Sequence, residues 1–140
     1  MRFMSMVKSS EDYRLGPPPQ ELMEAMDKLG EEMKAAGAMI DMGGLLPSAM
    51  NGYRVRLSGG KLSVTDGPFS EAKEVIGGYA VFAVKTKEEA VEWTRRFMDL
   101  HRVHWPEWEG EAEVRQMFEG PGCPDDERSD PRSVAAEHAK

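Results

Sequence analysis

The sequence predicts an α+β protein in which two helices cover one face of an antiparallel sheet. Three observations support this prediction: a strictly alternating hairpin in the middle of the chain, two segments with apolar residues at helical spacing, and short apolar runs around them. The chain has 140 residues, which is the length of one ordinary domain that can support its own core.

The N-terminal part predicts a strand followed by a helix. Residues 2–8 alternate as a strand, and both of its faces carry apolar side chains. A helix is expected over residues 19–36, since Gly37 is a natural helix stop and four apolar residues form one stripe: Leu22, Met26, Leu29 and Met33. We interpret this stripe as core packing against a sheet.

The middle of the chain predicts three strands. Residues 38–46 form the first, and its Gly43-Gly44 pair indicates a bulge or a close backbone approach. Residues 53–57 and 62–65 alternate strictly around Gly59-Gly60, a pair that suits a tight primed turn. A two-residue turn there places apolar opposite apolar and polar opposite polar: Leu57 with Leu62, Val55 with Val64, Arg56 with Ser63, and Arg54 with Thr65.

The C-terminal half predicts a strand, a helix and a last strand. After a long connection over residues 66–77, residues 78–85 form a strand that is apolar on both faces. Thr86, with Glu89 three residues later, forms a capping box for a helix that ends near His104, before Pro106. The last strand covers residues 113–118. The domain is expected to span 1–118, with a polar tail over 119–140.

The expected order of elements is β-α-β-β-β-α-β, an arrangement of the ferredoxin-like type. Two helices cover only one face of a sheet, yet the strands at 2–8 and 78–85 are apolar on both faces. A second copy is the simplest cover for the other face, so we expect a homodimer with its two sheets face to face.

Composition excludes several classes of function. The net charge is −7, which argues against direct binding to nucleic acid or to an anionic membrane surface. The sequence has no signal peptide, no membrane-spanning run and one cysteine, Cys123, so we expect a cytoplasmic protein. No phosphate-loop or dinucleotide glycine pattern occurs, and we expect no cofactor.

Candidate site residues cluster around the hairpin and the connection after it. Asp66 suits either a turn, with its carboxylate on backbone amides, or a general acid or base. Arg54 and Arg56 project to one side together, either as solubility residues or as an anion clamp. Glu71 and Lys73 form either a solvated ion pair or part of a pocket, and Tyr79 is either a core aromatic or a hydrogen-bond donor to a ligand.

Two histidines near the end of the second predicted helix are candidate metal ligands. His101 and His104 are spaced i, i+3, with Glu107 and Glu109 nearby in sequence. Histidine also suits a helix C-terminus through its interaction with the helix dipole. There is no metalloprotease-type signature, and we expect no metal.

The run from Val64 to Glu74, VTDGPFSEAKE, followed by Gly77-Gly78-Tyr79, resembles the signature of the DGPF group of YCII-related proteins. The resemblance covers roughly residues 1–118. It implies a ferredoxin-like fold, a dimeric α+β barrel and a bacterial source, and some members accompany sigma factors. A His–Asp dyad has been proposed in related proteins. The helix over 19–36 contains no histidine, so only Asp66 has a counterpart here.

These observations leave three hypotheses for function. The first is a cofactor-free lyase or isomerase that uses Asp66, with Arg54, Arg56, Glu71, Lys73 and Tyr79 around its substrate. The second is a dimer that binds a small molecule without turnover. The third, which follows from the resemblance, is a regulatory dimer associated with a sigma factor rather than with DNA.

Overall fold

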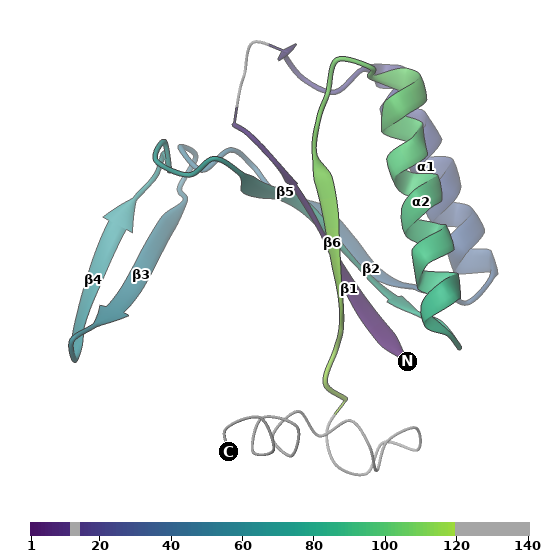
Figure 1. Ribbon diagram of the computed structural model, residues 1–140. Helices are drawn as coiled ribbons and strands as arrows, with labels where there is room; N and C mark the ends of the chain where they lie inside the picture. Colours follow the sequence, from purple (N-terminus) through teal and green to yellow (C-terminus); the bar gives the residue numbers. More distant parts are fainter. Residues whose placement is uncertain (12–14, 120–140) are drawn as a thin grey trace.

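The computed structural model describes residues 1–11 and 15–119 (Figure 1). Its elements are β1 (Arg2–Ser9), α1 (Gln20–Ala35), β2 (Met39–Gly44), β3 (Tyr53–Ser58), β4 (Lys61–Asp66), β5 (Val75–Ala83), α2 (Lys87–His104) and β6 (Glu111–Gln116). Four strands lie between the helices, one for each of the segments predicted at 38–46, 53–57, 62–65 and 78–85. The expected order β-α-β-β-β-α-β therefore counts one strand too few.

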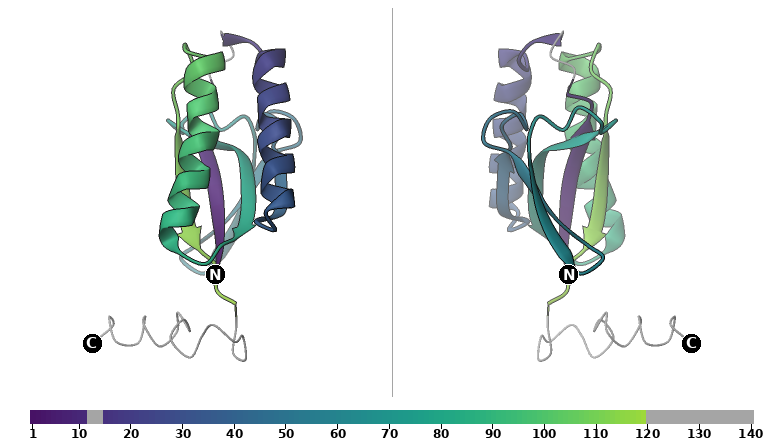
Figure 2. Two further views of the ribbon diagram at one scale, coloured as in Figure 1. Left: turned by 90° about the vertical axis from the view of Figure 1, so that its right-hand side faces the viewer. Right: turned by 90° about the vertical axis from the view of Figure 1, so that its left-hand side faces the viewer.

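The main sheet has four strands in the order β2-β5-β1-β6, and every neighbouring pair is antiparallel. Both helices lie on the same face of this sheet, as the two views of Figure 2 show. The fold is therefore α+β and consistent with the ferredoxin-like type that the sequence predicts. We call the face of the main sheet that points away from the helices the open face.

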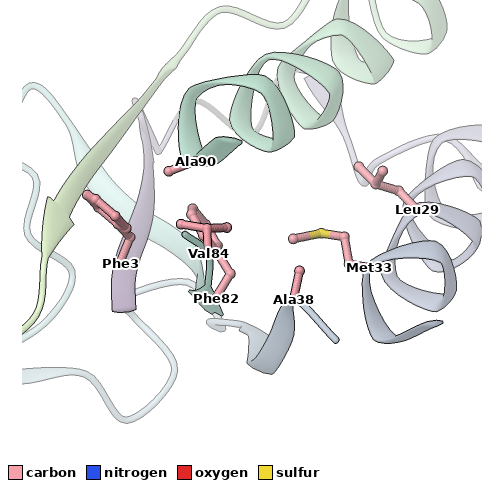
Figure 3. Close-up of a cluster of buried hydrophobic side chains, with 7 residues drawn as sticks. All are labelled: Phe3, Leu29, Met33, Ala38, Phe82, Val84 and Ala90. Atoms are coloured by element: carbon pink, nitrogen blue, oxygen red, sulfur yellow. The ribbon is translucent and has the colours of Figure 1, made fainter. Parts of the chain in front are cut away.

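The hydrophobic core lies between the helices and the sheet (Figure 3). On the sheet side, the stacked rings of Phe3 and Phe82 have their centroids 6.3 Å apart. The predicted stripe of α1 supplies Leu22, Leu29 and Met33, all of which are buried. The helical periodicity therefore identified the residues that hold α1 to the sheet.

The predicted signals at the helix ends are present, with one difference. Gly37 has φ +72°, the left-handed conformation that ends α1. The Thr86 side chain accepts a hydrogen bond from the Glu89 amide at 3.2 Å. The Glu89 carboxylate accepts from the amide of Lys85, also at 3.2 Å, rather than from that of Thr86. In a standard capping box the Glu89 carboxylate would accept from the N-cap amide, that of Thr86; here its partner is the residue before the N-cap.

The hairpin of β3 and β4 forms a separate two-stranded sheet, and residues 53–66 are called the arm below. All four predicted cross-strand pairs are present, and Gly59 and Gly60 both have positive φ, as a primed turn requires. The arm stands away from the body, on the side of the sheet opposite to the helices (Figures 1 and 2). None of its large apolar side chains is covered.

Several expectations stay outside this description. Cys123 and nearly all of the expected tail over 119–140 lie beyond the described residues. Within the described ranges, no helix is both long enough and apolar enough to cross a membrane.

Candidate functional site

The arm separates the predicted site residues onto two faces. Directly paired residues share a face, so Arg54, Arg56 and their partners Thr65 and Ser63 lie on one side of the arm. Asp66 pairs with Tyr53 and therefore lies on the other side, with the apolar residues. The hairpin does not bring the two arginines and Asp66 together into one cleft.

Arg54 fastens the loop that follows the arm. Its guanidinium carbon lies 3.9 Å from the centre of the Phe69 ring, and the guanidinium also pairs with the Glu71 carboxylate. The pKa of Glu71 is lowered, first by a hydrogen bond from backbone N–H and then by Arg54. Glu71 thus pairs with Arg54 and not with Lys73, which is exposed and makes no ion pair with any described residue.

The root of the arm is built around Ser48, which is 8% exposed. The Ser48 hydroxyl donates to Glu11 at 2.5 Å and accepts from the Phe69 amide at 3.0 Å, and the Ser48 amide donates to Glu11 at 2.7 Å. The amide of Gly67 donates to the carbonyl of Gly52 at 2.8 Å. This network joins the segment just after β1, the loop before the arm and the loop after it, and sequence reasoning missed it.

At two positions of this root, the backbone of Ser48 comes so close that only glycine fits. A Cβ on either Gly52 or Gly67 would collide with the Ser48 carbonyl oxygen, which is backbone and has little freedom to move. Gly67 precedes Pro68 through a cis peptide bond. The Asp66-Gly67-Pro68-Phe69 segment therefore serves, at least in part, to seat the arm on the body.

The Asp66 carboxylate is exposed and makes no hydrogen bond or ion pair with the described part of the chain. The turn interpretation predicted that it would accept from backbone amides ahead of it. The next amide, that of Gly67, donates instead to Gly52, so the turn is held by backbone rather than by the aspartate. Its carboxylate remains available to meet a ligand.

A different polar pair lies on the open face. The Tyr79 hydroxyl, on β5, donates to the Asp41 carboxylate, on β2, at 3.0 Å. Donating to an anion raises the pKa of Tyr79, since ionising the phenol would place two negative charges together. The Tyr79 ring lies over Gly43, where an added Cβ would be 3.0 Å from a ring carbon. This is the close approach that the glycine pair predicted.

Asp41 was not among the predicted site residues, and β2 is irregular next to it. The pairing of β2 with β5 shifts register between Met39 and Asp41, so Ile40 is extra in the ladder. Alternation counted along the sequence therefore assigns the wrong face to residues beyond the shift. The signal in the sequence that could have revealed it is Asp41 itself, the one charged residue in the otherwise apolar segment 38–46.

The two histidines of α2 have separate environments. His101 is buried between Phe97 and Trp108, with ring centroids 4.9 and 4.5 Å away, and its Nδ1 lies 3.1 Å from the Phe97 carbonyl oxygen. Burial lowers the pKa of His101. His104 lies 4.0 Å from Glu21 of α1. Within residues 1–11 and 15–119, no three His, Cys, Asp or Glu side chains are gathered as a metal site.

Comparison with known families adds the decisive observation. The family model described as YCII-related domain matches residues 1–98. The chain belongs to this family. The YCII-related match includes β1, the whole arm, its root and the Tyr79–Asp41 pair, whereas His101 and His104 lie beyond it. No curated protein matches the chain.

Proposed function

We propose that this YCII-related chain is a homodimer, packed through its open sheet faces, that binds a small polar molecule at the Tyr79–Asp41 pair. Met4 pairs with Val81, and Met6 pairs with Tyr79, on this face. Charged residues occupy its β6 side: Lys8, Glu111, Glu113 and Arg115. An apolar centre with a polar rim is the usual anatomy of an interface.

The Tyr79–Asp41 hydrogen bond carries the ligand proposal. An ionised carboxylate has about four acceptor positions, and the Tyr79 hydroxyl fills one of those on Asp41. When a second sheet removes water from this face, the remaining positions need donors, because an unsatisfied buried charge is costly. A ligand that presents several hydroxyl or ammonium donors supplies them, which favours a polyol, an amino sugar or an amine.

The test is a thermal-shift screen of polyols, amino sugars, amines and, as a contrast, carboxylates. We expect donor-rich compounds to raise the melting temperature of the wild type and to lose this effect in Asp41→Asn and Tyr79→Phe. Asp27→Asn, the same chemical change on the exposed side of α1, is the control and should keep the shift. A shift that survives Asp41→Asn, or one produced by carboxylates alone, contradicts the assignment.

A cofactor-free acid–base enzyme is the second candidate, and the free Asp66 carboxylate favours it. In that case Asp66→Asn abolishes turnover of the metabolite that binds, without changing the melting temperature. Turnover that is unaffected by Asp66→Asn rejects Asp66 as the acid or base, and binding without any product supports the binding protein.

A further inference from the structure

We infer that the arm is a clasp, and that its apolar face packs on the body of a second copy of this chain. The inference rests on the proposed homodimer and adds to it the surface that makes the pairing stable. By two-fold symmetry, each copy grips the other in the same way.

The first argument is the exposure of the arm. Five large apolar side chains share one of its faces, and each is between 57% and 72% exposed: Tyr53, Val55, Leu57, Leu62 and Val64. A two-stranded hairpin with no layer packed on it is at best marginally stable in water. A contiguous uncovered apolar surface of this kind is typical of an interaction site.

The second argument is the direction in which the arm is held. The Ser48 network and the Arg54 contacts with Phe69 and Glu71 fix its root from both sides. From that root the arm extends away from the sheet, on the side of the open face (Figures 1 and 2). A second copy that docks on the open face therefore comes within reach of the arm.

The third argument is area. Strands about 4.8 Å apart, with a rise of about 3.3 Å per residue, give a four-stranded sheet six residues long a face of roughly 380 Å². Two such faces packed together bury roughly 760 Å² in total, which is no more than a typical crystal-packing contact buries. Each arm covers roughly 200 Å² and buries as much of its partner, so two arms raise the total to roughly 1,600 Å², which is typical of a stable complex.

The fourth argument is charge. The arm, residues 53–66, carries three basic residues, Arg54, Arg56 and Lys61, and one acidic residue, Asp66, which gives it a net charge of +2, whereas the whole chain has a net charge of −7. The rest of the chain is thus strongly acidic, and a basic arm is attracted to the body of another copy. This complementarity favours a second copy over an unrelated acidic partner, because every copy carries both surfaces.

The experiment measures dimer dissociation by analytical ultracentrifugation of the full chain. In the double variant Leu57→Lys, Leu62→Lys we expect the Kd to rise about 100-fold or more, since burying one leucine is worth at least about tenfold. The control, Ser58→Lys with Ser63→Lys, adds the same charge to the opposite face of the arm and should change the Kd much less. Both variants alter exposed residues, so circular dichroism should show an unchanged fold.

A photo-crosslinking amino acid in place of Leu57 gives an independent readout. It should join two chains, whereas the same group at Ser58 should not. If the wild type is a dimer and the Leu57, Leu62 variant dimerises equally well, the clasp is wrong and the sheet-packed homodimer stands. If the wild type is a monomer at high concentration, both proposals fail. Arm-dependent retention of nucleic acid by a monomeric chain also overturns the clasp.

Discussion

The body and the arm show what a sheet gains from a second layer. Both consist of regular antiparallel ladders with alternating sequences, and both have the register that their side chains favour. In the body, helices cover one face, and Phe82 is 2% exposed. In the arm, Leu62 has the same place in an apolar face and is 72% exposed. The alternation of apolar and polar residues defines the strands equally well in both regions. Whether the apolar face is buried depends on whether a second layer packs against it.

The sharpest test of this contrast is a matched pair of truncations. Phe82→Ala should lower the free energy of unfolding by about 3–5 kcal/mol, because it removes a ring from the core. Leu62→Ala, measured at concentrations where the chain is monomeric, should change it by less than about 0.5 kcal/mol. Urea denaturation checks both. A large loss from Leu62→Ala in the monomer would mean that the arm packs on its own body.

The joint between the two regions is tested by Gly67→Ala. The added Cβ collides with the Ser48 carbonyl, so we expect a loss of about 1–3 kcal/mol, as in an overpacked site. Hydrogen exchange should show the loss of protection beginning in β3 and β4. Gly44→Ala is the control, because nothing lies within 4 Å of its Cβ position. Equal effects at the two glycines would contradict the special role of the root.

The body alone should respond to removal of the α2 cap. Thr86→Ala deletes the acceptor for the Glu89 amide and should cost about 1 kcal/mol in urea denaturation. Thr94→Ala provides the comparison, since the Thr94 hydroxyl bonds back to the Ala90 carbonyl within the helix and is not a cap. We expect the latter change to be within about 0.5 kcal/mol of zero.

The smallest expected effect is a pH dependence that is also confined to the body. Burial lowers the pKa of His101 below the value of about 6.5 of an unfolded histidine. Below pH 6.5 the unfolded chain therefore takes up the proton first, and stability falls as the pH drops toward the folded pKa. Between pH 7.5 and 5.5, the urea midpoint of the wild type should fall more than that of His101→Gln. Equal slopes would show that His101 titrates normally.

Local signals in the sequence predicted local structure well. The hairpin register, the primed turn and the end of α1 each depend on a few neighbouring residues, and each is confirmed. The start of β5 was placed three residues late, because Val75 and Ile76 join the strand only through pairing with β1, where Gly77 is bulged. Likewise β6 was expected at 113–118 and lies at Glu111–Gln116, since its register is set by β1.

The candidate site was less predictable, because it depends on contacts that are remote in the sequence. Tyr79 and Asp41 are 38 residues apart and meet only because β2 and β5 pair around a bulge. Ser48 reaches both Glu11 and Phe69, and no pattern around the serine indicates either contact. The separation of Asp66 from the arginines, by contrast, follows from the predicted hairpin register and could have been derived from it.

The hydrogen bond between Gly67 and Gly52 also makes the arm a self-contained insertion between β2 and β5. The two ends of the insertion meet there, between β2 and β5, so the connection across its base is short whatever the length of the ribbon beyond it. Insertions with adjacent ends are the kind that a fold tolerates. The arm can therefore lengthen, shorten or change its apolar face while the four-stranded order stays the same. Under the clasp proposed above, such a change alters the surface offered to the second copy while the core stays as it is.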